Sequence, residues 1–312
     1  MSSWLNDFEV KGRVIYVKST GAKLPLNLEI MHEALVWLPF FVVEKLKRLS
    51  RLPSKKPRLN IAFTPVIPRP WYMLWVSTHR ADMKFVSDIN QADVIFYFED
   101  QTSATPPKLS KALHKKSFNF GCTDISKSRV GDVFEKIFGY ALTVDPESYS
   151  GPIAVKSEIN GVHDGYEAQA PVARTEGKVY QRLIDNTVNS KWAEDLRCPV
   201  IGGEIELIFV KRRSLSHRFA NTNANVTLHS PDDLLSNEER RKIKQFAAAM
   251  GLDWGGMDVL RNKEDGKIYI VDVNKTDMGP PIALSLKDKN TATEILTKQF
   301  IKLIHSKIKR NP

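Results

Sequence analysis

The sequence contains very little cysteine: Cys122 and Cys198 are the only two among its 312 residues. Their spacing does not match a metal-binding motif, and two cysteines are too few for a disulfide framework. A zinc-binding module and a small secreted scaffold held together by disulfides are therefore excluded. We expect the protein to work in a reducing, cytoplasmic environment.

The sequence suggests neither a signal peptide nor a membrane-spanning helix. The first ten residues, MSSWLNDFEV, contain acids and lack an apolar core, so we do not expect a signal peptide. The apolar stretch ALVWLPFFVV, residues 34–43, is shorter than the roughly 20 residues that a bilayer requires. Basic residues dominate the segment that follows, so contact of residues 34–58 with an anionic membrane surface is one interpretation. We prefer a helix packed on the core, followed by a solvated basic linker.

Length and charge narrow the class of protein. A chain of 312 residues is longer than one hydrophobic core usually organises, so we expect two or three subdomains. The apolar fraction of 42% and the charged fraction of 26% are ordinary for a globular protein. The formal net charge of +10 favours an anionic partner. We do not expect nucleic acid to be that partner, because no motif combines aromatic and basic residues as nucleic-acid-binding modules do.

Strands alternate with helices through the first 120 residues, which is the pattern of an open α/β sheet. Apolar runs at 60–63 and 91–101 predict two of its strands, the second one buried. A helix at 30–50 precedes them. We therefore expect residues 1–120 to form an α/β domain with a helical N-terminal extension.

Two acidic side chains interrupt apolar strands near the C-terminus. GGMDVL places Asp258 in one strand, and the turn KEDG leads back to IVDVN, which contains Asp272 and Asn274. Alternate residues of a strand share a face, so the three side chains can converge. Two carboxylates and an amide oxygen are hard ligands of the kind that Mg²⁺ or Mn²⁺ takes. The alternative is that both acids face solvent on an edge hairpin, but apolar residues flank each of them.

The segment AAAMGLDWGGMDVLRNKEDGKIYIVDVNKT, residues 247–276, resembles the metal-binding end of the ATP-grasp superfamily. The resemblance extends over about residues 120–290 and implies an ATP-grasp fold, in which two α/β subdomains clasp the nucleotide. It divides the chain into a domain at 1–120 like the one that precedes the grasp in this family, a small lid subdomain at 121–190, and a metal- and ATP-binding subdomain at 191–312. It also implies that Asp258, Asp272 and Asn274 bind Mg²⁺ and the phosphates of ATP.

Upstream segments follow the family's order and imply further ATP-binding residues. DISKSRV and GPIAVKS are similar to the segments that carry the two phosphate-binding lysines, here Lys127 and Lys156. EINGVHDG stands where the family has a glycine-rich loop, and within it His163 and Asp164 are unusual. KVYQRLID resembles the strand that contacts adenine and ribose, which implies roles for Gln181, Arg182, Leu183, Ile184 and Asp185.

A second resemblance concerns the transferred group. EDLRCPVIGGEIELIFVKRR resembles the hairpin of those ATP-grasp ligases that add glutamate to protein or peptide tails, and implies that Arg197 approaches the transferred phosphate. Arg212 or Arg213 and Asn221 fall where that group has further phosphate and substrate contacts, and we favour Arg213. Guanidinium groups suit phosphate and carboxylate alike. The chain departs from the ligases at Lys275, where they have smaller residues, and at Asp272, where they have glutamate; both departures bear on the acceptor and metal chemistry.

The resemblance implies an Mg²⁺- and ATP-dependent ligase that joins a carboxylate to an amine through an acyl phosphate and forms ADP, with catalytic roles for Arg197, Lys156 and Arg213. At least one of the two substrates should be anionic. The alternative is a kinase of the same fold that phosphorylates a hydroxyl of an anionic small molecule. A nucleotide- or nucleic-acid-binding module without turnover is the third possibility, against which the intact metal-binding set argues.

Overall fold

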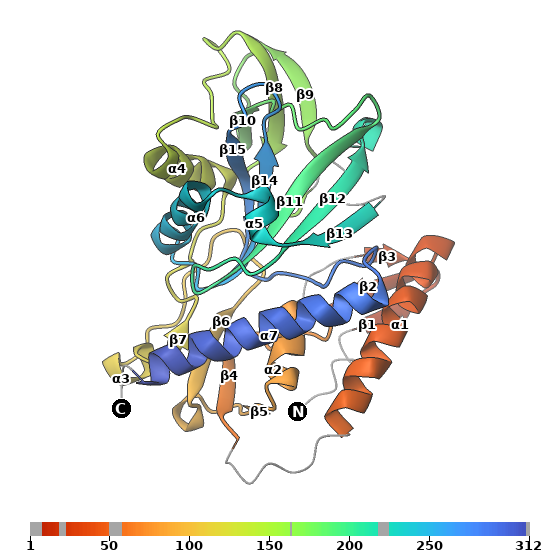
Figure 1. Ribbon diagram of the computed structural model, residues 1–312, viewed down its shortest axis with the longest axis vertical. Helices are drawn as coiled ribbons and strands as arrows, with labels where there is room; N and C mark the ends of the chain where they lie inside the picture. The colour runs from red at the N-terminus through yellow and green to blue at the C-terminus, as the bar shows by residue number, and fades with distance from the viewer. Residues whose placement is uncertain (1–7, 19–22, 50–57, 163, 218–224, 310–312) are drawn as a thin grey trace.

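The computed structural model describes residues 8–18, 23–49, 58–162, 164–217 and 225–309, and within these ranges the strands form four sheets (Figure 1). Asn221 and His163 lie outside the described residues. None of the described helices is long and apolar enough to pass through a lipid bilayer.

The N-terminal domain is built on a parallel sheet with the strand order β5-β4-β6-β7. Its central strand β6 reads VIFYF, and all five residues are buried, as expected for a parallel strand that is covered on both faces. The open α/β sheet and the two strands predicted at 60–63 and 91–101 are confirmed. The strands and helices of this domain are β4 (Asn60–Pro65), α2 (Met73–Arg80), β5 (Lys84–Phe85), β6 (Val94–Phe98), α3 (Lys111–His114) and β7 (Ser117–Phe118).

An extension precedes this sheet. Three short antiparallel strands, β1 (Phe8–Lys11), β2 (Val14–Val17) and β3 (Lys23–Pro25), lead into the helix α1 (Leu28–Leu49), which confirms the helix predicted at 30–50. Phe40 of α1 is 1% exposed and joins the core that α2 and the parallel sheet share. The prediction that this helix packs on the core is therefore confirmed for one of its faces.

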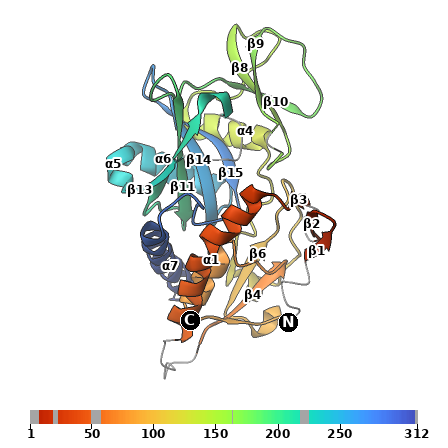
Figure 2. The same ribbon diagram turned by 90° about the vertical axis from the view of Figure 1, so that its right-hand side faces the viewer.

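The middle of the chain forms a small antiparallel sheet with the order β10-β8-β9. Figure 2 shows it at the upper end of the molecule, away from the parallel sheet. Its strands are β8 (Gly151–Ser157), β9 (Tyr166–Ala170) and β10 (Lys178–Arg182).

The largest sheet is antiparallel, with the order β13-β12-β11-β14-β15. Helices α4 and α6 pack on its apolar face, and the other face carries the polar residues described below. β11 and β12 pair as an antiparallel hairpin, and Gly202 and Gly203 at the start of its turn have positive φ angles, which glycine adopts without strain. The elements are α4 (Lys127–Phe138), β11 (Trp192–Ile201), β12 (Ile208–Ser214), β13 (Asn225–His229), α5 (Pro231–Leu234), α6 (Asn237–Ala249), β14 (Trp254–Arg261) and β15 (Ile268–Asn274).

The last helix, α7 (Leu286–Lys309), returns to the N-terminal domain (Figure 1). Phe300 is fully buried and packs in one cluster with Phe96 of the parallel sheet and Trp254 of the large sheet. The two sheets thus share a hydrophobic core around α7, which fixes the end of β6 close to the loop that follows β15.

Candidate functional site

The polar face of the large sheet brings four predicted residues into register. Arg197 of β11 lies opposite Asp258 of β14, and Asp258 lies opposite Asp272 of β15. Directly opposed residues of antiparallel strands have Cβ atoms about 5 Å apart on one face, so this row crosses three strands at side-chain contact distance. Asn274 follows Asp272 by two residues on the same face. The expected convergence of Asp258, Asp272 and Asn274 on one face is confirmed. The alternative, in which both acids face solvent on an edge hairpin, does not hold, because both lie in the row with Arg197.

Arg197 binds two carboxylates at the centre of this face. Its Nη1 lies 3.0 Å from Asp258 Oδ2 and its Nη2 lies 2.6 Å from Asp277 Oδ1. Lys211 Nζ lies 3.3 Å from the other oxygen of Asp258. Burial opposes ionisation of Asp258, but Arg197 and Lys211 outweigh it and hold the pKa of this carboxyl well below its usual range. A Cβ at Gly256 would lie 2.7 Å from both Arg197 Nε and Asp277 Oδ2, so the glycine of the G-x-D pattern makes room for this ion pair.

Asp272 is held differently from Asp258. Its Oδ1 is buried and has no hydrogen bond within the described residues; the ammonium of Lys127, at 3.9 Å, is its ion-pair partner. Burial raises the pKa of Asp272, and the positive charge of Lys127 only partly offsets this. A buried carboxylate oxygen without a donor is destabilising by several kcal/mol unless a cation binds it.

The residues present fit a divalent cation. Asp272 Oδ1 is buried and accepts no hydrogen bond from the described residues, and Asp258 lies directly opposite. Asn274 Oδ1 accepts a bond from the backbone N–H of Thr276 at 2.9 Å, which orients the amide at the end of β15. The described residues contain no group of three or more His, Cys, Asp or Glu that could hold a metal ion, so a cation here would rest on the two carboxylates, the amide and oxygens of a bound ligand.

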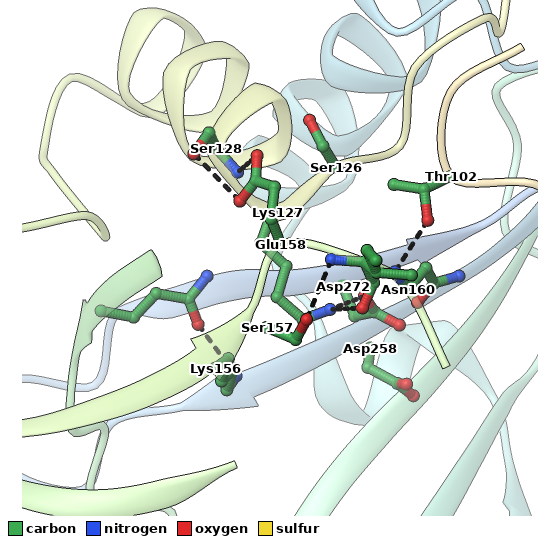
Figure 3. Close-up of polar contacts among 12 residues, drawn as sticks. Thr102, Ser126, Lys127, Ser128, Lys156, Ser157, Glu158, Asn160, Asp258 and Asp272 are labelled. Atoms are coloured by element: carbon green, nitrogen blue, oxygen red, sulfur yellow. Dashed lines mark hydrogen bonds and ion pairs between the residues drawn. The ribbon is translucent and has the colours of Figure 1, made fainter. Parts of the chain in front are cut away.

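Both predicted lysines approach Asp272. Lys127 is the first residue of α4, whose N-terminus is capped by the Ser126 hydroxyl, and it extends from the helix toward Asp272 (Figure 3). Lys156 lies on β8, and its Nζ donates to Gln181 Oε1 at 2.8 Å. Burial lowers the pKa of Lys156 to about 8 although Asp272 acts in the opposite direction. Each lysine is thus a partly desolvated positive charge beside the carboxylates.

The segment after β8 closes over the start of α4. Glu158 accepts bonds from the backbone N–H of Ser128 at 3.3 Å and from its hydroxyl at 3.1 Å, and the backbone N–H of Asn160 donates to Thr102 Oγ1 at 2.8 Å (Figure 3). Asp164 forms an ion pair with Lys178 of β10 and does not reach the carboxylates. The loop is therefore tied both to α4 and to the N-terminal domain.

The residues assigned to adenine and ribose follow one another along and beyond β10. Gln181 is 1% exposed and faces Lys156. Two backbone donors of this segment are already used: Arg182 N–H bonds to Leu142 O at 2.9 Å and Leu183 N–H bonds to Pro152 O at 3.2 Å. Ile184 belongs to the core below the sheet, Asp185 Oδ1 accepts from Thr187 N–H at 3.0 Å, and the Arg182 side chain is exposed and lies 6.0 Å from the Tyr149 ring.

Three charged residues of this face were not predicted from the sequence: Lys211, Asp195 and Asp277. Arg213, preferred to Arg212 on sequence grounds, lies 3.1 Å from Asp195 Oδ2, whereas Arg212 points away and pairs with the partly exposed Glu194. The signal for Lys211 was available, because alternate residues of β12 share a face and Lys211 precedes Arg213 by two. Asp277 lies beyond the last strand, so no periodicity could find it.

Lys275, directly after β15, is 2% exposed, and its Nζ has no hydrogen-bond partner among the described residues. The ammonium lies 5.7 Å from the centre of the Tyr97 ring in β6. Next to it, Thr276 Oγ1 donates to Asp100 Oδ1 at 2.7 Å. The end of β6 and the loop after β15 therefore form one polar junction beside the charged face.

Comparison with known proteins gives a match in structure alone. No protein-family model and no curated protein sequence matches the chain. The chain is similar to the ATP-grasp ligase PsnB in complex with a minimal precursor, with 12% identity, a TM-score of 0.50, and coverage of 80% of this chain and 99% of that one. D-alanine–D-alanine ligase from Bacillus anthracis matches with 12% identity and a TM-score of 0.49, over 82% of this chain and 98% of its own. The expected fold class is confirmed: the chain has the fold of the ATP-grasp ligase PsnB.

Proposed function

We propose that the protein is an Mg²⁺- and ATP-dependent ligase that joins a carboxylate to an amine and releases ADP and phosphate. The observation that carries this proposal is the row Arg197, Asp258 and Asp272, with a buried oxygen of Asp272 that lacks a donor. Lys127 and Lys156 approach this row from α4 and β8. The arrangement supplies oxygens for a metal ion and positive charges for phosphates, on the fold of known ATP-grasp ligases.

In this reaction a substrate carboxylate oxygen forms a bond to the γ-phosphorus of ATP, and the bond to the β–γ bridging oxygen breaks, which gives ADP and an acyl phosphate. The amine nitrogen then bonds to the acyl carbon, phosphate leaves, and the nitrogen loses a proton. A bound Mg²⁺ supplies charge neutralisation at the phosphates. The protein's own contribution is alignment of the reactants and stabilisation of developing negative charge.

We assign each residue of the site a separate role in binding ATP or in the reaction. Lys156, buried beside Gln181, is a fixed positive charge for the inner phosphates, and Lys127 at the N-terminus of α4 is placed for an outer phosphate. Arg197 is held rigidly by Asp258 and Asp277, so its guanidinium can face the transferred group without reorientation. Arg213 with Asp195, and the ribose and adenine contacts along 181–185, complete the ATP site. Asp258, Asp272 and Asn274 would hold the metal.

The substrates are a carboxylate and an amine, at least one of which is anionic. The net charge of +10 supports an anionic partner. The ammonium of Lys275 has no hydrogen-bond partner among the described residues and lies beside the junction with Asp100. This junction is on the side of the N-terminal domain, which we propose selects the acceptor.

Product analysis tests the proposal. The purified protein is incubated with Mg²⁺, ATP labelled at the γ-phosphate, and pools of carboxylates with amines, including amino acids and short peptides. The expected products are ADP, free labelled phosphate and an amide whose mass is the sum of the substrates less one water. Label retained on the acceptor would show a kinase and refute the ligase proposal. Absence of turnover in every pool, in a protein that binds Mg²⁺-ATP, would also count against it.

A further inference from the structure

Helix α1 carries an apolar stripe that no described residue covers. Six large apolar side chains recur every three or four residues and are between 45% and 84% exposed. This spacing places them along one side of a helix of 22 residues. Figure 2 looks onto α1, which runs along the outside of the molecule. The outer stripe consists of Leu28, Met31, Leu35, Leu38, Val42 and Leu46.

The opposite side of α1 accounts fully for its attachment to the protein. Phe40 is 1% exposed in the core that α1 shares with α2 and the parallel sheet, and Phe41 stacks on Trp75 of α2 with ring centres 6.2 Å apart. Glu44 forms a buried ion pair with Arg80 of α2. Since these contacts fix the helix by its inner side, the outer stripe is not needed for folding. A contiguous exposed apolar stripe of this length on a globular protein indicates a binding surface.

The charge beside the outer stripe indicates what covers it. Residues 44–58 read EKLKRLSRLPSKKPR and contain seven basic residues and one acid. The segment that follows the stripe therefore has a net charge of +6, compared with +10 for the whole chain. Anionic lipid headgroups complement this charge, and basic residues near such a surface strengthen binding to it. A second copy of α1 would present the same basic segment and offers no comparable acidic surface.

We propose that α1 docks the protein on an anionic lipid bilayer, with the outer stripe in the interfacial layer. The basic residues that follow the stripe in the sequence supply positive charge for the headgroups. The helix lies in the plane of the surface, as amphipathic interfacial helices do. This inference is independent of the ligase activity, because none of the stripe residues contacts the charged face of the large sheet.

Vesicle flotation with the full chain tests the proposal. The protein is mixed with vesicles of phosphatidylcholine alone or of phosphatidylcholine with phosphatidylglycerol, and the floated fraction is measured at increasing salt. We expect flotation with the anionic vesicles, little with the neutral ones, and a decline with salt. Leu35→Asn/Leu38→Asn should weaken binding to anionic vesicles by about tenfold to a hundredfold, because both half-exposed leucines lose their burial in lipid.

The matched control is Val188→Asn/Ile308→Asn, which removes two apolar residues that are 45% and 36% exposed but lie outside the stripe. It should float like the wild type. Circular dichroism melting of both double variants verifies that they fold. No flotation of the wild type with anionic vesicles would overturn the proposal, as would equal flotation of the stripe variant. Light scattering that shows a dimer in solution, dissociated by Leu35→Asn/Leu38→Asn, with no vesicle binding, would assign the stripe to a second copy and also overturn it.

Discussion

Replacing Arg197 by methionine should destabilise the protein far more than the loss of a surface arginine. The side chain of Arg197 is 9% exposed and bridges Asp258 and Asp277, and the latter side chain is itself 8% exposed. Methionine leaves Asp277 buried without a cation. Breaking a buried ion pair by removing one partner costs about 3–5 kcal/mol. Since whole domains are stable by about 5–15 kcal/mol, the loss is a large fraction of the total.

Urea denaturation followed by circular dichroism measures this loss. The matched control is Arg212→Met on the same hairpin, where the arginine is 53% exposed and pairs with Glu194; a pair of this kind contributes at most about 1 kcal/mol. We expect the midpoint for Arg197→Met to fall several times further than that for Arg212→Met. Adding Asp277→Asn to Arg197→Met should recover part of the loss, because the orphaned charge disappears. Equal costs for the two arginines would refute the argument that the ion-pair cluster is buried and rigid.

Three further outcomes follow from the buried charges. ATP affinity should fall as pH rises through about 8, where Lys156 loses its proton, and Lys156→Arg should flatten this profile. Above about pH 8 the free energy of unfolding should rise with pH, because Lys156 then binds more protons in the unfolded chain than in the folded one. Asp272→Asn should raise the melting temperature of the ligand-free protein at neutral pH. The pKa of Asp272 is raised in the folded chain, so its charge destabilises the fold at pH values above the pKa of about 3.9 that aspartate has in the unfolded chain. Mg²⁺-ATP should stabilise only the wild type. Lys275→Met should stabilise the protein by about 1 kcal/mol in denaturant titrations, because it removes a buried donor without an acceptor, and a loss of stability would show that the contact with Tyr97 outweighs that cost.

The position of the two carboxylates was predictable because it depends on local pattern. Asp258 and Asp272 belong to one hairpin with a short turn, so strand alternation and turn length fix their register. Lys156 and Arg197 lie on strands whose alternation is equally clear, and the resemblance to a family supplied the order in which these strands meet.

The rest depends on contacts between distant segments. Asp277 reaches Arg197 from an irregular loop, and Lys275 lies near Tyr97 of the parallel sheet, so neither contact has a periodic signal. The orientation of helix α1 could not be predicted for a different reason. Its sequence is apolar on both sides, and hydrophobicity alone does not tell which side packs on the protein. In the folded chain the stack of Phe41 on Trp75 and the Glu44–Arg80 ion pair decide this.

Isothermal titration of ATP, with and without Mg²⁺, into the wild type and Asp272→Ala tests the central claim most directly. The control is Glu264→Ala, an exposed acid in the turn of the same hairpin. We expect Mg²⁺-dependent binding by the wild type and by Glu264→Ala, and loss of most of this binding in Asp272→Ala. Wild-type protein that ignores ATP, or an Asp272→Ala variant that binds Mg²⁺-ATP as tightly as the wild type, would contradict the assignment of this charged face as a metal–nucleotide site.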